Sequence, residues 1–132
     1  MLLVKTKIGL SKLHGIGLFA DQFIPKGTKI WEFTPGIDLK FGESELVSMP
    51  ETIRNFIKGY SYQNNKTKKY ILCVDNARFF NHSDQANTED AENGTSEGAT
   101  ISSVDINLGE ELTWNYRLGD ASWTERKFLQ EL

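Results

Sequence analysis

A chain of 132 residues with 39% hydrophobic and 11% aromatic content has enough apolar side chains for one compact core and too few residues for two ordinary domains. Its net charge of −3 and isoelectric point near 5.4 argue against a dedicated nucleic-acid-binding protein, which normally carries clustered Lys and Arg. The single cysteine, Cys73, excludes an intramolecular disulfide and a zinc site built from several thiolates of this chain.

The N-terminal segment is apolar over residues 1–4 only, because Lys5 and Lys7 follow. A run this short fits neither the core of a signal peptide nor a membrane span. Together with the single cysteine, this predicts a cytoplasmic protein that does not contact a membrane.

The first forty residues alternate short apolar runs with Gly and Pro, which predicts short strands joined by tight turns. The expected strands cover residues 8–10, 16–20, 30–33 and 37–41. Two of the turns, at 25–27 and 34–36, combine the fixed φ of proline with a glycine that tolerates positive φ.

One helix is expected next. Ser48 and Glu51 have the spacing of a capping box, Pro50 suits the first turn, and the apolar residues that follow recur at helical spacing. Gly59 is placed to end this helix.

The second half of the chain predicts strands at 70–74, 99–106 and 112–116, and a short terminal helix at 124–132. Between the first two strands, residues 84–98 are acidic and small. Their simplest interpretation is a solvated polar loop.

Four segments carry the functional signal, and each alone has an ordinary structural explanation. Residues 15–17, Gly-Ile-Gly, usually mark a turn, but a backbone without Cβ also lets a bulky ligand approach closely. Residues 78–83, Arg-Phe-Phe-Asn-His-Ser, are consistent with a core corner whose polar groups are satisfied. Residues 109–116, Gly-Glu-Glu-Leu-Thr-Trp-Asn-Tyr, are a turn entering a strand. The last segment contains Tyr60 and Tyr62, which follow the helix.

The two histidines, His14 and His82, have no ligand-type residues at metal-binding spacing around them. Each is therefore interpreted as a hydrogen-bonded structural residue, and no metal is expected.

In this order and spacing, the four segments resemble the signature motifs of the SET-domain family of protein-lysine methyltransferases. The resemblance covers residues 8–116 and leaves 117–132 as a C-terminal tail of a single SET domain spanning 1–132. It implies a mostly β fold with short helices, of the β-clip type, in which small sheets surround a C-terminal pseudoknot. The compact form, without a zinc-binding tail, resembles stand-alone bacterial or viral members.

The resemblance also implies S-adenosyl-L-methionine as the cofactor, S-adenosyl-L-homocysteine as its product, and no metal. In similar proteins the Gly-x-Gly loop lines the cofactor site with main-chain groups, and the Asn-His pair holds the methionine part and the adenine. The cofactor-binding residues implied for this chain are Gly15, Ile16, Gly17, Arg78, Asn81, His82, Tyr116 and Trp123. Arg78 leads into the Asn-His pair, and Trp123 either covers the adenine or packs in the core or tail.

The residues implied for catalysis are tyrosines. Tyr116, the last tyrosine of its motif, sits at the methyl-transfer point, while Tyr60 lines the lysine channel and Tyr62 is a second candidate for that role. Trp114 occupies a channel position at which the family commonly carries Phe or Tyr and which influences how many methyl groups fit.

Two departures from the family pattern affect the expected channel. Phe33 replaces a tyrosine and so removes one hydroxyl. Asp84 stands where many relatives have a zinc-binding cysteine. The channel is therefore expected to be closed by C-terminal residues, such as Trp123 and Phe128, or by a partner subunit in a homodimer.

The implied activity is methyl transfer from S-adenosylmethionine to the side-chain amine of a lysine in a protein or peptide. Histones, histone-like proteins and ribosomal proteins are candidate substrates. The acidic residues of 84–98 either attract such Lys-rich proteins or are only solvated surface. Two alternatives remain: a SET-fold module that binds cofactor or peptide with little or no turnover, and a related small β-fold in which the motifs serve the core alone.

Overall fold

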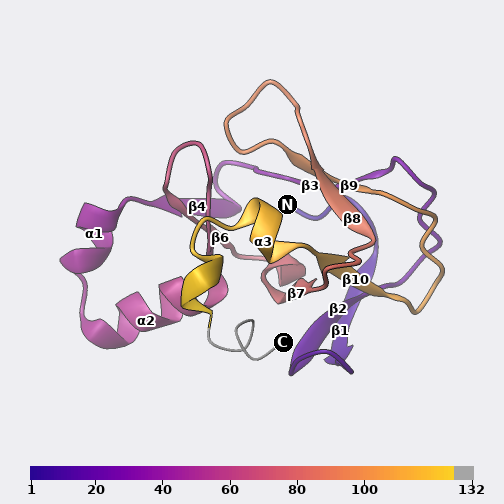
Figure 1. Ribbon diagram of the computed structural model, residues 1–132, viewed down its shortest axis with the longest axis horizontal. Helices are drawn as coiled ribbons and strands as arrows, with labels where there is room; N and C mark the ends of the chain where they lie inside the picture. The colour runs from indigo at the N-terminus through magenta and orange to yellow at the C-terminus, as the bar shows by residue number, and fades with distance from the viewer. Residues whose placement is uncertain (127–132) are drawn as a thin grey trace.

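Three small sheets and a few short helices make up the fold, as predicted, and the computed structural model describes residues 1–126 (Figure 1). The first sheet has the order β1 (Thr6–Leu10), β2 (Ile16–Ala20), β10 (Glu111–Trp114), β7 (Asn81–His82). The second has the order β3 (Lys29–Glu32), β9 (Ala99–Ser102), β8 (Thr88–Ala91). The third has the order β4 (Asp38–Phe41), β6 (Tyr70–Cys73), β5 (Tyr62–Gln63).

The helices connect and cover these sheets. They are α1 (Glu43–Val47), α2 (Glu51–Tyr60), α3 (Tyr116–Gly119) and the 3-10 turns η1 (Asn76–Phe79) and η2 (Trp123–Glu125). In Figure 1, α1 and α2 lie at one end of the molecule and the β1–β2 hairpin at the other, with α3 between them. None of the helices within residues 1–126 is long and apolar enough to cross a membrane.

Strand β10 is inserted between β2 and β7, and this insertion assembles the site. It pairs antiparallel with β2 and parallel with β7, where Thr113 lies opposite Asn81 and Trp114 opposite His82. The segments 78–83 and 109–116, which are far apart in the sequence, therefore run side by side. A strand from the end of the chain is thus tied into the N-terminal half of the fold.

The predicted strands and turns of the first half of the chain are confirmed, with ends shifted by a residue or two. Gly27 and Gly36 have φ angles of 84° and 87°, as the two turns require. The strand expected at 112–116 is shorter than predicted, because the Asn115 side chain accepts a hydrogen bond from the Arg117 amide and begins α3. Tyr116 therefore lies on a helix rather than a strand.

The helical region differs from the prediction because α1 was not expected. The Ser48 hydroxyl donates to the Glu45 carbonyl at 2.8 Å and so belongs to the last turn of α1. Pro50, not Ser48, occupies the cap position of α2. Gly59 lies inside α2, which ends at Tyr60.

The interpretation of residues 84–98 as loop alone was wrong, since they contain β8. This strand pairs with β9 from Thr88 opposite Ser102 to Ala91 opposite Ala99. Its two acidic residues, Glu89 and Asp90, are exposed, which is why its composition resembles that of a loop. Of the terminal helix expected at 124–132, the structure describes only the turn η2, and the rest lies outside the described residues.

Buried apolar side chains form three groups between the sheets. The first joins β2, β3 and β10, the second joins β3, β6 and η1, and the third joins α1, α2 and β6. Together they fix the positions of the strand ends from which the functional residues project. Their members include Leu18, Ile30 and Leu112; Trp31 and Ile71; and Leu46, Ile57 and Tyr70.

Candidate functional site

Asn81 joins three of the predicted motifs through one side-chain amide. Its Nδ2 donates to the carbonyls of His14 and Ile16 at 2.9 and 3.1 Å, and to Glu111 Oε2 at 3.0 Å. The side chain is buried on β7. The structure therefore brings the Gly-x-Gly turn, the Asn-His pair and the start of β10 into one cluster.

Gly17 has a packing reason to lack a side chain. A Cβ at this position would lie 2.6 Å from Glu111 Oε2 and 3.1 Å from Ser11 Cβ. The Glu111 carboxylate is itself held by the Ser11 hydroxyl at 2.7 and 2.9 Å, as well as by Asn81. The group that closely approaches the hairpin backbone at Gly17 is therefore the Glu111 carboxylate. A ligand-facing role for Gly15, Ile16 and Gly17 stays a prediction.

His82 is held by a fixed set of partners on both ring nitrogens. The Tyr116 amide donates to Nδ1 at 3.1 Å, so Nδ1 is an acceptor and Nε2 carries the proton. Nε2 donates to Asp84 Oδ1 at 3.0 Å, and Arg117 Nε donates to the same oxygen at 3.0 Å. Asp84, at the position expected for a zinc ligand in relatives, thus belongs to an ion-paired network that orients His82.

We expect Asn81→Ala to lower the free energy of unfolding by about 2 to 3 kcal/mol, because the partly buried Glu111 carboxylate and two hairpin carbonyls lose their donor. Denaturant unfolding followed by circular dichroism measures this loss. The matched control is Asn65→Ala, since Asn65 is exposed and donates to the Leu118 carbonyl alone. A loss no larger than that of the control would show that Asn81 does not tie the motifs together.

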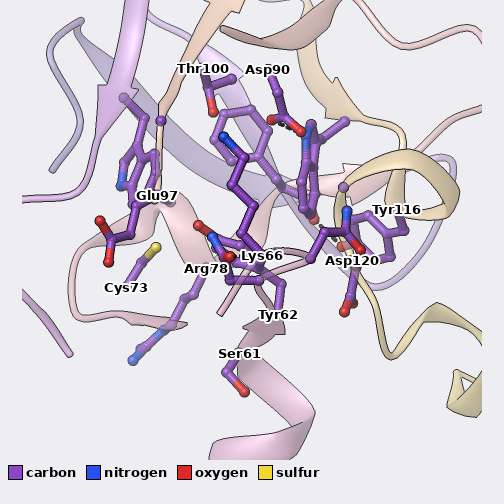
Figure 2. A pocket seen from close by; sticks show the side chains of 18 of the residues that line it. Ser61, Tyr62, Lys66, Cys73, Arg78, Asp90, Glu97, Thr100, Tyr116 and Asp120 are labelled. Carbon is purple, nitrogen blue, oxygen red and sulfur yellow. Dashed lines mark hydrogen bonds between the residues drawn. The ribbon is translucent and has the colours of Figure 1, made fainter. Parts of the chain in front are cut away.

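A cavity of about 320 Å³ lies between β5, β8, β10 and the C-terminal segment, and we call it the aromatic cavity. Figure 2 shows Asp90 and Thr100 at the opposite end from Ser61, with Tyr116 and Asp120 on one flank and Cys73 and Glu97 on the other. The predicted residues Tyr60, Tyr62, Arg78, Trp114 and Tyr116 all line it. The sequence did not indicate that Trp31 lines it as well.

Tyr116 connects the aromatic cavity to the Asn-His pair. Its hydroxyl donates to the Phe80 carbonyl, one residue before Asn81, and its ring lies 5.5 Å from the His82 ring and 5.6 Å from the Trp114 ring. Burial raises the pKa of Tyr116 to about 12. The hydroxyl is therefore protonated near neutral pH and acts as a hydrogen-bond donor.

The two candidate channel tyrosines lie in different surroundings. The Tyr62 ring meets the Trp114 ring edge to face at 5.2 Å and the Trp31 ring at 6.4 Å. Burial, and then the neighbouring Cys73, Asp90 and Glu97, raise the pKa of the Tyr62 phenol. Tyr60 is 43% exposed at the end of α2 and packs beside Phe79 at 6.1 Å. Tyr62 is thus part of the aromatic wall, whereas Tyr60 lies at the rim.

Arg78 stands at the same rim as Tyr60. Its guanidinium lies 5.0 Å from the centre of the Phe79 ring and 5.5 Å from that of Tyr60. The Arg78 Nε is buried and has no hydrogen-bond partner among residues 1–126. Arg78 thus places a positive charge at the rim of the cavity, which suits an anionic ligand group such as a carboxylate.

The C-terminal segment closes one flank of the aromatic cavity through Asp120 and Arg126. Arg126 Nε donates to Asp120 Oδ2 at 2.8 Å, its Nη2 donates to the Ser61 carbonyl, and its guanidinium lies 5.1 Å from the Tyr116 ring centre. Asp120 is 1% exposed and also accepts from the Gln63 amide at 2.9 Å. An ion pair thus holds this segment against β5.

Of the two residues expected to close the channel, the structure describes only Trp123. Trp123 packs over the Arg117 guanidinium at 5.1 Å, so it lies beside the network that orients His82. Phe128 lies outside the described residues. Within the described part of the chain, no three His, Cys, Asp or Glu side chains are grouped so as to hold a metal ion.

Comparison with known proteins identifies the fold. The family model of the SET domain matches residues 15–117. A crystal structure of a candidate histone methyltransferase from Plasmodium falciparum is 25% identical, with a TM-score of 0.59 over 92% of this chain and 99% of that one.

Two structures of the Polycomb Repressive Complex 2 of Chaetomium thermophilum share the fold at 22% identity. The autoinhibited complex bound to S-adenosylmethionine has a TM-score of 0.65, and the match covers 97% of this chain and 17% of that chain. The apo complex with mutations in Ezh2 has a TM-score of 0.67 and corresponding coverages of 94% and 16%. This chain thus spans about a sixth of those longer chains. Because the family model covers most of its length, the chain belongs to the SET-domain family.

Proposed function

We propose that this protein transfers a methyl group from S-adenosylmethionine to the side-chain amine of a lysine in a protein or peptide. The observation that carries the proposal is the position of Tyr116. Its hydroxyl is fixed at the Phe80 carbonyl, with the Asn-His pair on one side and the aromatic cavity on the other. One tyrosine thereby joins a cofactor-side cluster to a cavity suited to an alkyl chain.

The donor set of the cofactor side is compatible with S-adenosylmethionine. The fixed Asn81 and His82 would hold the molecule, and the guanidinium of Arg78, three residues before Asn81, would supply a positive charge for the carboxylate of the methionine part. Bound in this way, the cofactor would supply an electrophilic methyl group on a sulfonium. Trp123 would border the adenine in this proposal, since it packs over Arg117 of the His82 network.

The residues of the aromatic cavity suit the acceptor side of the reaction. A lysine amine must lose its proton before it attacks, and its ordinary pKa is about 10.4. Aromatic walls formed by Tyr62 and Trp114 remove water from the ammonium and so lower the cost of deprotonation. The protonated Tyr116 hydroxyl is held in one direction by its hydrogen bond to the Phe80 carbonyl. It can therefore orient the attacking nitrogen. Alignment and desolvation together would supply the catalysis.

Two measurements test the proposal. Calorimetry should detect saturable S-adenosylmethionine binding that Arg78→Ala weakens, because the variant removes the guanidinium charge. A peptide array with labelled cofactor, followed by mass spectrometry, should report methyl-lysine and its methylation state. The absence of cofactor binding would contradict the whole proposal. Binding without transfer to any lysine peptide would instead favour a binding module.

A further inference from the structure

Asp90 on β8 presents a carboxylate to the aromatic cavity. Its Oδ1 accepts the indole Nε1–H of Trp114 at 2.9 Å, and its strand partner Thr100 also lines the cavity (Figure 2). The side chain is exposed because the cavity it faces is open. The residues around the carboxyl nevertheless remove part of its water, and this burial raises the pKa of Asp90. The hydrogen bond from Trp114 acts in the opposite direction. A ligand entering the cavity would therefore meet this carboxylate directly.

The other cavity carboxylates already have cationic partners. Glu92 pairs with Lys66 at 3.2 Å, Asp120 pairs with Arg126 at 2.8 Å, and Glu97 pairs with Lys40. Asp90 has no cationic partner among the described residues, and its one hydrogen bond comes from a neutral indole. Once a ligand displaces water from the cavity, an unpaired carboxylate there becomes costly unless the ligand brings a positive charge.

The walls beside Asp90 favour a cation on an alkyl stem. Trp114 holds Asp90 through its indole nitrogen, and its ring meets Tyr62 at 5.2 Å, so two aromatic rings adjoin the carboxylate. Such rings bind both methylene groups and an ammonium. Buried Trp31 also lines the cavity.

We propose that Asp90 binds the ammonium group of the lysine as it enters the aromatic cavity, and so selects a charged primary amine before the amine leaves the carboxylate and gives up its proton. This inference rests on the proposed function, because it names the group that recognises the acceptor of that reaction. Asp90 was expected to be part of a solvated loop, and its role depends on β8, which turns this one acidic side chain toward Trp114.

The test uses n-butylammonium as a probe of the lysine side chain and the Trp114 indole signal in proton–nitrogen NMR spectra as the readout. Trp114→Phe identifies this signal among those of the three tryptophans. In the wild type, n-butylammonium should shift the signal in a saturable manner, and the uncharged 1-butanol should bind at least tenfold more weakly. Asp90→Asn should abolish this preference, because the amide oxygen still accepts from Trp114 but the charge is gone. Glu43→Gln, at an exposed carboxylate that pairs with Lys58 at 3.2 Å and does not line the cavity, should leave the preference unchanged.

Equal binding of the two probes by the wild type, or an unchanged preference in Asp90→Asn, would overturn the role of Asp90. The dispersion of the same spectra reports whether each variant is folded. Probe binding requires neither cofactor nor turnover, so it is independent of the calorimetry and peptide array described above. If the protein prefers the charged amine but transfers no methyl group, the role of Asp90 is supported and the proposed reaction is contradicted. If it transfers a methyl group without this preference, the proposed reaction is supported and the role of Asp90 is contradicted.

Discussion

Tyr116→Phe is expected to reduce the single-turnover rate of methyl transfer by about 100-fold or more, the size of effect produced by removing one positioned hydroxyl from a reacting centre. The substitution removes the hydrogen bond to the Phe80 carbonyl, which fixes the tyrosine between the Asn-His pair and the aromatic cavity. Because the ring remains, its contacts with His82 and Trp114 should persist. The rate is measured with labelled cofactor at saturating concentration.

Calorimetry on the same variant separates chemistry from binding. S-adenosylmethionine affinity should change by no more than about threefold, since the His82 Nδ1 partner is the Tyr116 main-chain amide. Tyr70→Phe is the matched control, because Tyr70 is buried in the helical group of core residues rather than in the aromatic cavity. Equal activity in Tyr116→Phe and the control would remove the Tyr116 hydroxyl from the proposed mechanism.

The raised pKa of Tyr116 also affects alkaline stability. An unfolded tyrosine ionises near pH 10, whereas burial holds the pKa of folded Tyr116 at about 12. The stabilisation from this difference is complete below pH 10 and is lost as the pH rises through 12. Tyr116→Phe should therefore lose less stability than the wild type between pH 10 and 12.

The sequence motifs predicted the family and the residues around Tyr116, because those residues lie in short segments with specific spacing. The turns at Gly27 and Gly36 were also predictable, since their geometry depends on adjacent residues. The relation between Asn81 and the hairpin was implied only by resemblance. It requires β10 to pair with β2 and β7 at once, which no local pattern encodes.

The residues that sequence reasoning missed depend on long-range contacts. Asp90 belongs to a segment whose composition is that of a solvated loop, yet pairing with β9 turns its carboxylate toward Trp114. Asp120 and Arg126 have no motif of their own; they pair over six residues, but they contact Gln63 and Ser61 only because the chain returns along β5 after α3. The sequence feature that pointed to such residues was the missing zinc-binding cysteine. Because a metal-held tail cannot form without it, other residues have to close the cavity.

Gly119 lies directly against the Trp114 ring, so adding a side chain at this position should have a large effect. A Cβ at this last residue of α3 would overlap Trp114 Cζ2 and lie 2.6 Å from Cε2. The indole would have to move, so Gly119→Ala should break the hydrogen bond to Asp90 and disturb the contact with Tyr62. We expect the free energy of unfolding to fall by about 3 kcal/mol, at the upper end of the range for overpacked sites.

Gly59→Ala provides the control for the backbone effect of the same substitution. Gly59 lies in α2, and a Cβ there would meet nothing within 4 Å, so alanine should be neutral or stabilising by up to about 1 kcal/mol.

A smaller ring at residue 114 should relieve the overlap with the new Cβ at residue 119. Trp114→Phe introduced into Gly119→Ala should therefore cost less than Trp114→Phe in the wild type. Denaturant unfolding of the four proteins in this cycle measures the coupling. Additive losses would mean that α3 yields instead of the indole, and the aromatic wall would then tolerate a side chain at residue 119.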